Sequence, residues 1–137
     1  MMLTITSVCK AEVWVVTSVE SDLSHLSMEQ CKRLWLGELE AIDGKRVFVV
    51  DQFTTAQERT EFYTLVADMN QNKLRSYWAK KIFSSGLFPP DSKPDDATVI
   101  EWIKQENNRI GYINSDSYRP DLKVLYVIKK VTKSDEK

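Results

Sequence analysis

The sequence predicts a single α/β domain in which helices cover both faces of a layered sheet. The chain has 137 residues, which is close to the commonest size of one domain. Its composition, 42% hydrophobic and 28% charged, is ordinary for a globular chain that buries its own core. Segments rich in β-branched residues alternate with segments of helical periodicity, and this alternation is typical of a layered α/β sheet.

The first strand and the first helix have clear local signals. Residues 11–17 (AEVWVVT) are β-branched and aromatic, which predicts a buried strand. Ser27 is expected to begin a helix, because its hydroxyl can accept from the first turn and Gln30 occupies the reciprocal capping-box position. Gly37 is expected to end that helix.

A second strand and three further helices follow. Asp43-Gly44 predicts a turn, and residues 46–50 (RVFVV) predict the second strand. The loop 51–55 leads into one helix. A second helix runs from Asn70 to Gly86. The first of the three helices is expected to turn Phe62, Leu65 and Val66 inward. In the second, Asn70 is the expected cap and the inward face is marked by Leu74, Tyr77, Trp78, Lys81 and Ile82. In the third, Asp95 or Asp96 is the expected cap and the inward residues are Val99, Trp102 and Ile103.

Two strands close the domain, at residues 110–113 and 122–128. The predicted order is therefore β-α-β-α-α-α-β-β. In sheets of this kind, ligands gather beyond the carboxyl ends of strands, where helices begin.

Charge and cysteine content exclude several classes of function. The net charge is −1, so a nucleic-acid binder is not expected. No CxxC or HxxxH spacing occurs, so we expect no metal site, and no motif indicates a cofactor. No apolar stretch has the length of about 20 residues that a membrane span needs. A Cys9–Cys31 disulfide and two free thiols are both compatible with the sequence.

We divide the chain into three parts. Residues 12–130 form the domain, and residues 131–137 are a charged tail. Residues 1–11 are either an N-terminal extension or the remnant of a signal peptide, since Cys9-Lys10-Ala11 loosely fits a small-x-small cleavage pattern.

The most suggestive local feature is the loop that follows the second strand. The start of a helix presents free N–H groups and the positive end of a dipole, which suits phosphate, sulfate or carboxylate. Arg59 lies one turn inside the helix and is a candidate cation. The alternative is that the threonines only cap the helix. The candidate residues of this loop are Asp51, Gln52, Thr54, Thr55 and Arg59.

Thr17-Ser18, after the first strand, forms a second polar loop, which is either part of a site or a plain turn. Catalytic patterns are absent from the sequence, because His25 has no identifiable nucleophile beside it and no GxSxG or phosphate-binding loop occurs. We therefore expect a binding protein and not an enzyme.

Several segments, taken in order, resemble a known family. They are 26–37 (LSMEQCKRLWLG), 47–52 (VFVVDQ), 61–63 (EFY), 74–78 (LRSYW), 82–86 (IFSSG), 89–90 (PP) and 108–112 (NRIGY). This series, within roughly residues 12 to 126, resembles the phosphate ABC-transporter substrate-binding proteins and their short relatives.

The resemblance implies a three-layer, type II periplasmic-binding-protein-like single lobe, a periplasmic or secreted location, and phosphate or a similar oxyanion as ligand. It implies that the loop 51–55 is the ligand loop and that Arg59 lies near the anion. The chain departs from the family in two respects. Its loop lacks the Ser-Gly pair and contains Phe53, and 137 residues are too few for two lobes.

Two hypotheses follow. The chain is a solute-binding-like protein that holds an oxyanion at residues 51–59. Alternatively, it is a single-lobe accessory or interaction module that has lost ligand binding and uses the face where a second lobe would sit for a protein partner or for self-association. The second hypothesis predicts an exposed apolar patch of several hundred Å² on that face.

Overall fold

A computed structural model describes residues 11–129. In chain order the elements are β1 (Val13–Ser18), α1 (Met28–Trp35), β2 (Ala41–Ile42), β3 (Lys45–Arg46), β4 (Phe48–Val49), β5 (Asp51–Gln52), α2 (Gln57–Ala67), α3 (Gln71–Ser85), β6 (Ser92–Lys93), α4 (Asp96–Lys104), β7 (Arg109–Asn114), the 3-10 turn η1 (Ser115–Ser117) and β8 (Leu122–Ile128). The predicted order of major elements is confirmed, and β2, β5, β6 and η1 are additional to it.

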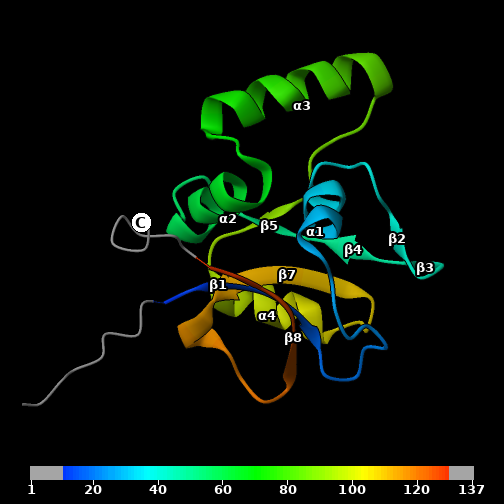
Figure 1. The fold of residues 1–137 in the computed structure, drawn as a ribbon, viewed down its shortest axis with the longest axis vertical. Helices are drawn as coiled ribbons and strands as arrows, with labels where there is room; N and C mark the ends of the chain where they lie inside the picture. The colour runs from blue at the N-terminus through cyan, green and yellow to red at the C-terminus, as the bar shows by residue number, and fades with distance from the viewer. Residues whose placement is uncertain (1–10, 130–137) are drawn as a thin grey trace, which may run out of the picture.

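The central sheet has the strand order β4-β7-β1-β8 (Figure 1). Strand β4 runs parallel to β7, whereas β1 is antiparallel to both β7 and β8. The register pairs Thr17 with Ile110, at the beginning of β7. The end of β1 therefore lies at the edge of the sheet where β7 starts.

Helices cover both faces of this sheet, as predicted (Figure 1). On one face α4 packs against β1 and β7, with Val99, Ile100 and Ile103 buried among Val16 and Ile113. Gly111 permits this approach, because a Cβ there would lie 2.6 Å from Cγ1 of Val99.

The opposite face carries the larger core, beneath α1 and α2. Trp35 and Phe62 meet edge to face at 4.8 Å, and Phe62 stacks on Tyr112 of β7 at 4.3 Å. Helix α3 lies outside this layer and is the outermost element on its side of the molecule (Figure 1). Its buried side chains are Leu74 and Trp78.

The N-terminal caps of the helices agree with the local sequence signals in three of four cases. Ser27 accepts from Gln30 N–H, and the Gln30 side chain accepts from Ser27 N–H, which completes the predicted capping box. Asn70 caps α3 and Asp95 caps α4. Five inward assignments are only partly correct: Ile82 is 37% exposed, and the half-buried residues are Leu65, Tyr77, Lys81 and Trp102.

The predicted continuous strand 46–50 is wrong. Asp43 and Gly44 both adopt positive φ, as a two-residue hairpin turn requires, and this turn pairs β3 with β2. Residues 48–49 pair with β7 as β4, and residues 51–52, just beyond the predicted strand, pair with β6 as β5. The segment therefore changes partner at each step, which its apolar composition does not reveal.

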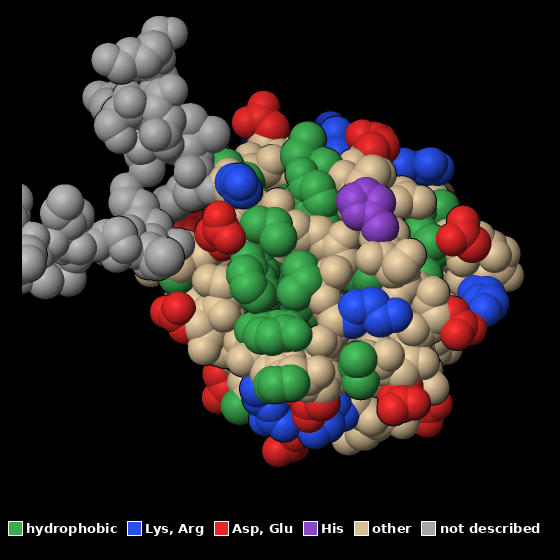
Figure 2. All heavy atoms as spheres, turned by 60° about the horizontal axis from the view of Figure 1, so that its bottom comes forward, with side chains coloured by type: hydrophobic (Ala, Val, Ile, Leu, Met, Phe, Trp, Pro, Cys, Tyr) green, Lys and Arg blue, Asp and Glu red, His purple; other side chains and the backbone are tan. Residues whose placement is uncertain are grey.

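Cys31 is buried and free, and burial raises the pKa of its thiol to about 12. Cys9 and residues 1–10 lie outside the described range, as does the predicted tail. Among the described residues, no helix combines the length and apolarity of a membrane span. On the side of the molecule around β8, apolar side chains form a stripe bordered by charges (Figure 2).

Candidate anion-binding site

Strand β5 places Asp51 and Gln52 in the protein interior, beneath α2. Both residues are buried, with 2% and 1% of their surface exposed. The strand continues β4, so its carboxyl end lies at the same edge of the fold as the end of β7. Two of the predicted ligand residues are thus enclosed by the fold before any ligand arrives.

The Asp51 carboxylate is fully occupied by partners of the chain itself. Oδ2 accepts from the Tyr63 hydroxyl at 2.6 Å and from Arg59 Nη1 at 3.0 Å. Oδ1 accepts from Gln52 N–H at 2.9 Å and from the Tyr112 hydroxyl. Burial, followed by the charge of Asp51, raises the pKa of Tyr63 and of Tyr112 well above the usual tyrosine value. Both hydroxyls therefore remain donors at neutral pH. We call these five residues the Asp51 network.

Gln52 connects three segments of the fold. Its Nε2 donates to Asp96 Oδ1 at 2.8 Å and to the Tyr112 carbonyl at 2.9 Å. Its own carbonyl accepts from Arg59 Nη1 at 3.1 Å. The donors predicted for a ligand at Gln52 are thus used to fasten β5 to β7 and α4.

Thr54 and Thr55 do not cap α2, so the alternative in which these threonines only cap the helix is wrong. The N-cap is Ala56, which makes no side-chain capping bond. The chain first makes a turn in which Ala56 N–H donates to the Phe53 carbonyl at 2.9 Å. Both threonines are exposed, and neither hydroxyl bonds to a described residue. They remain available to solvent at this edge.

Arg59 extends from α2 toward α3. Its side chain is 16% exposed, and its Nε is buried without a hydrogen-bond partner among residues 11–129. The side chain lines two neighbouring cavities between the helices, of about 420 and 220 Å³. The larger cavity is bounded by Thr54, Arg59, Gln71, Arg75, Trp78, Ala79, Ile82 and Pro89.

Arg75 brings a second guanidinium to the larger cavity and was not among the predicted site residues. Its Nη1 donates to Asn72 Oδ1 at 3.1 Å, and its other N–H groups bond to no described residue. Gln71 fixes the mouth of the cavity by donating to the Thr54 carbonyl at 3.0 Å. The only signal in the sequence was the lack of acidic residues in α3, and that does not place Arg75 opposite Arg59.

Acidic side chains dominate the carboxyl edge itself. Glu58, in the first turn of α2, lies 3.4 Å from the Asn114 amide. Asp96 accepts from Asn114 N–H and from the Ser117 hydroxyl. The hydroxyl and N–H of Thr98 lower the pKa of Asp95, which is therefore charged at neutral pH. An anion at the start of α2 would face these carboxylates, whereas the cavity beside Arg59 and Arg75 has no acidic lining residue.

The structure does not bring Thr17 and Ser18 to this site. The Thr17 hydroxyl donates to the Arg109 carbonyl at 2.7 Å, at the beginning of β7. Ser18 Oγ accepts from Glu20 N–H at 3.1 Å, in a local turn. Both residues are buried at the opposite edge of the sheet, so the plain-turn interpretation describes their geometry.

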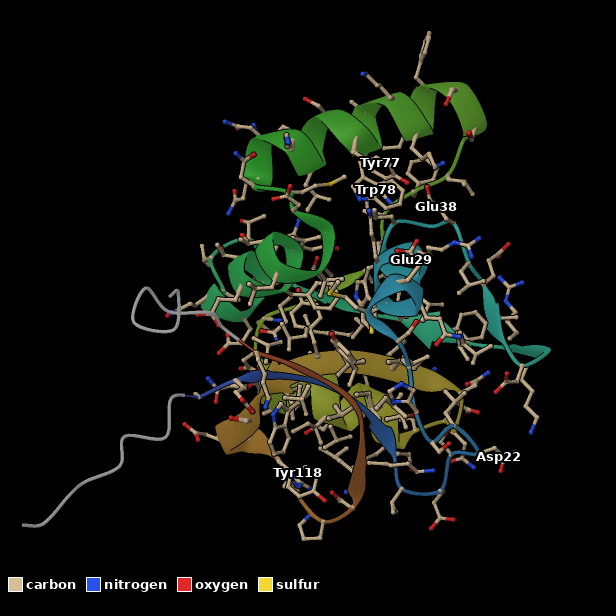
Figure 3. The ribbon with its side chains drawn as sticks, viewed as in Figure 1. Asp22, Glu29, Glu38, Tyr77, Trp78 and Tyr118 are labelled. Atoms are coloured by element: carbon tan, nitrogen blue, oxygen red, sulfur yellow. The ribbon has the colours of Figure 1, made fainter. Side chains whose placement is uncertain are left out.

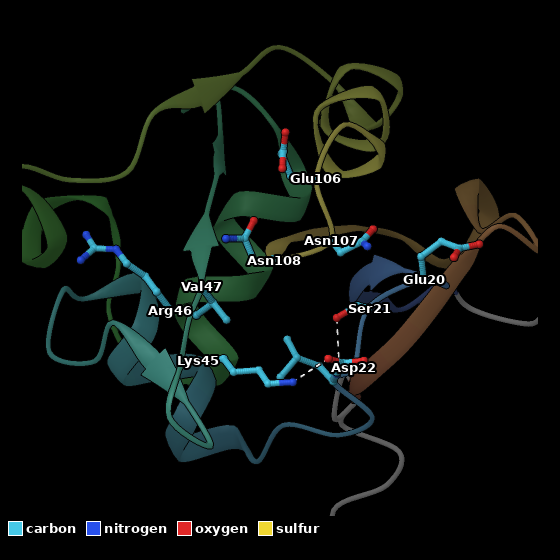
Figure 4. Close-up of a pocket in the computed structure, with 10 residues that line it drawn as sticks. Glu20, Ser21, Asp22, Lys45, Arg46, Val47, Glu106, Asn107 and Asn108 are labelled. Atoms are coloured by element: carbon cyan, nitrogen blue, oxygen red, sulfur yellow. Dashed lines mark hydrogen bonds and ion pairs between the residues drawn. The ribbon is translucent and has the colours of Figure 1, made fainter.

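A separate cavity of about 310 Å³ opens near that opposite edge (Figure 4). Its lining combines Glu20, Asp22 and Glu106 with Lys45 and Arg46. The Lys45 ammonium meets the Asp22 carboxylate at 2.5 Å, and both side chains are largely exposed. Mixed charge with an internal ion pair gives this hollow no preference for either sign of ligand.

The fold is similar to that of solved phosphate-transport receptors. The ABC-type phosphate transport receptor of Vibrio cholerae superposes with a TM-score of 0.67 at 13% identity, covering 84% of this chain and 45% of that one. PstS of Borrelia burgdorferi gives a TM-score of 0.59 at 16% identity, covering 84% and 46%. This chain therefore spans less than half the length of those proteins. No protein-family profile matches the sequence, and no curated protein is detectably similar in sequence.

At these identities the likeness concerns the fold. The predicted α/β, periplasmic-binding-protein-like fold is confirmed, and so is the resemblance to phosphate ABC-transporter substrate-binding proteins at the level of structure.

Proposed function

We propose that this chain is a solute-binding-like lobe that holds a small oxyanion of the phosphate class between α2 and α3, with Arg59 and Arg75 as its cations. The observation that carries the proposal is the buried Arg59 Nε, which has no partner within residues 11–129 while its side chain lines the cavity. An unpaired buried N–H donor is costly, so this guanidinium is not fully satisfied by the chain, and an oxyanion in the cavity would give it a charge-assisted hydrogen bond.

The bonding of the Arg59 guanidinium supports this proposal, because only some of its nitrogens are bonded to the chain. Its Nη1 is committed to Asp51 and to the Gln52 carbonyl, which holds the guanidinium in place. Nη2 bonds to no described residue and is not buried, so it remains for a ligand, and Arg75 adds positive charge from the facing helix. Thr54 supplies a hydroxyl at the same cavity. A planar guanidinium fixed on one edge and free on the other is suited to oxyanion recognition.

A single open lobe sets the expected strength of binding. The cavity exposes its anion to water, so the electrostatic attraction is weakened by solvent and by salt. We infer millimolar affinity that falls as ionic strength rises. A periplasmic or secreted location accompanies this proposal, and no catalytic step is part of it.

Phosphate titration of the full chain at low ionic strength tests the proposal, with tryptophan fluorescence as the readout. Trp78 borders the cavity, so its emission should change with phosphate and the change should be lost in Trp78→Phe. Arg75→Gln should abolish the response. Arg59→Lys should weaken it, because lysine keeps the charge opposite Asp51 but loses the Nε donor.

Arg33→Gln is the matched control, because Arg33 is an exposed arginine on α1 away from the cavity. It should respond as the unmodified chain does. No response of the unmodified chain in millimolar phosphate, or equal responses of Arg75→Gln and Arg33→Gln, would refute the assignment.

An interaction module without ligand binding is the second candidate function. The Asp51 carboxylate partly neutralises Arg59, and the carboxyl edge is acidic, which disfavours an anion there. The loop also lacks the glycine that close backbone approach would need. Chemical-shift mapping that finds no residue sensitive to phosphate would favour this candidate over the first.

A further inference from the structure

The segment that contains α3 carries an unusual charge. No acidic residue lies between Asp68 and Asp91, whereas this stretch includes Lys73, Arg75, Lys80 and Lys81. The chain has 19 basic and 20 acidic residues, so removing these four cations leaves 15 basic against 20 acidic elsewhere. One helix is therefore cationic on a body with an excess of five negative charges.

Among residues 11–129, the lysines of α3 have no acidic partners. Lys73, Lys80 and Lys81 form no ion pair with a described residue, and Lys81 Nζ lies 5.6 Å from the Tyr77 ring centroid. Together with Lys32 of α1 they line an open cleft of about 810 Å³, and Asp68 is the only acidic residue that the described part of the chain contributes to its lining. Their charge is available to an external partner.

Large apolar side chains project at the carboxyl end of the same helix. Phe83 is 94% exposed and Phe88 is 73% exposed, with Leu87 at 44% and Ile82 at 37%. Gly86, with φ of 70°, ends α3 and turns the chain back toward the body, so that residues 87 and 88 follow the helix end directly. We call Ile82, Phe83, Leu87 and Phe88 the apolar tip.

The inner side of α3 is firmly attached. Trp78 and Leu74 are buried, and the Tyr77 hydroxyl donates to the Leu36 carbonyl at 2.6 Å. Tyr77 and Trp78 point from α3 toward the body in Figure 3. The exposure of the apolar tip is thus a feature of an anchored helix, because the hydrophobic side chains that hold α3 are different residues.

Two lysines share one side of α3 with Phe83. At about 100° per residue, Lys80 and Phe83 lie within about 80° of Lys73 in one direction around the helix axis, so these three residues form one broad stripe along α3, whereas Lys81 lies outside it. We propose that this stripe and the apolar tip dock on the surface of an anionic phospholipid bilayer. The two phenylalanines would enter the headgroup boundary, and the lysines would lie among the lipid phosphates.

The shape and charge of the molecule favour a bilayer over a protein partner. A protein would need a hollow that matches two protruding rings, whereas a fluid interface accommodates them wherever they land. The excess negative charge of the body would orient α3 toward an anionic surface and the remainder away from it.

Vesicle co-flotation of the full chain tests this proposal. Vesicles of phosphatidylcholine alone should recover little protein, and vesicles containing phosphatidylglycerol should recover most of it at low salt. Lys73→Gln with Lys80→Gln should weaken binding by about tenfold or more, from a contribution of roughly 1 kcal/mol per cation. Phe83→Ser with Phe88→Ser should weaken it further, and this loss should persist in high salt.

Lys45→Gln with Val19→Ser is the matched control, since it removes one exposed cation and one exposed apolar side chain away from α3. It should bind as the unmodified chain does. Inorganic phosphate at constant ionic strength should not compete, which separates a bilayer from a free-anion site.

Three results would overturn the proposal. The first is the absence of flotation with anionic vesicles, and the second is equal flotation of the α3 variants and the control. The third is a chain that does not bind vesicles but self-associates with rising concentration, provided that Phe83→Ser with Phe88→Ser abolishes the self-association. That result would assign the apolar tip to a second copy of the chain.

Discussion

The Asp51 network and α3 both concentrate charge, but they neutralise it differently. Asp51 lies in the interior and receives four hydrogen bonds or ion contacts from Arg59, Tyr63, Tyr112 and Gln52. The lysines of α3 lie in solvent and have no acidic partner among the described residues. Charges satisfied internally hold a fold together, while charges left unpaired are available for recognition. Arg59 belongs to both classes, because one edge of its guanidinium is paired and its Nε is not.

The largest expected effect comes from breaking the internal set. Asp51→Ala leaves a buried cation and two buried hydroxyls without their acceptor, so the free energy of unfolding should fall by about 3–5 kcal/mol. Urea denaturation followed by circular dichroism measures this change. Asp22→Ala removes the exposed partner of Lys45 and should leave the unfolding midpoint unchanged. Equal shifts in the two variants would mean that the Asp51 network has no special role in stability.

The stability contributed by the Asp51 network should depend on pH in the alkaline range. The pKa values of Tyr63 and Tyr112 are raised in the folded state, so the folded chain keeps protons that the unfolded chain loses above about pH 10. Stability is therefore complete below that pH and declines as pH rises toward the folded pKa values. Cys31 adds a similar decline as the pH rises toward its folded pKa of about 12.

Tyr63→Phe should make this decline shallower, and should itself cost about 1–3 kcal/mol by removing one donor to Asp51. Denaturant melts at a series of pH values measure the slope. Tyr118→Phe, at an exposed ring, is the control and should keep the slope of the unmodified chain. A steeper slope in Tyr63→Phe would contradict the account.

A smaller effect separates the two positions at which the sequence predicted helix caps. Ser27→Ala should destabilise the chain by about 1 kcal/mol, since it removes a complete capping box. Thr54→Ala should change the unfolding midpoint little, because Ala56 occupies the cap of α2. Thermal melts of both variants decide the point, and an equal loss in Thr54→Ala would show that the start of α2 has been misplaced.

These two positions also show where sequence reasoning succeeds. Ser27 and Gln30 lie three residues apart, and their reciprocal bonds depend on local geometry alone, so the capping box was predictable. The same holds for Asn70, Gly86 and the order of the major elements. Thr54 looked equally suitable, but the turn from Phe53 to Ala56 delays the helix by two residues.

The candidate site was only partly predictable because its geometry is non-local. Asp51, Thr54 and Arg59 were selected from one short segment, and the structure does bring Arg59 onto Asp51. Arg75 joins them only because α3 packs beside α2, and no spacing in the sequence encodes that angle. Thr17 was chosen as a strand end, but β1 runs antiparallel to β7, which sends it to the opposite edge.

The smallest expected effect on stability belongs to Arg75→Gln. Arg75 is exposed and lies outside the Asp51 network, so its replacement should change the free energy of unfolding by less than about 0.5 kcal/mol. Chemical denaturation provides that value. A substantial loss of stability would place Arg75 with the internally satisfied charges and remove it from the proposed cavity site.

The most direct test of the central claim follows the arginine side chains themselves during a phosphate titration. Nitrogen-15 spectra of the full chain resolve arginine Nε–H signals, and those of Arg59 and Arg75 can be assigned through Arg59→Lys and Arg75→Gln. The account predicts that both signals move together with added phosphate at low salt, while the Arg33 signal stays in place. Stationary Arg59 and Arg75 signals, or equal movement of all arginines, would contradict it.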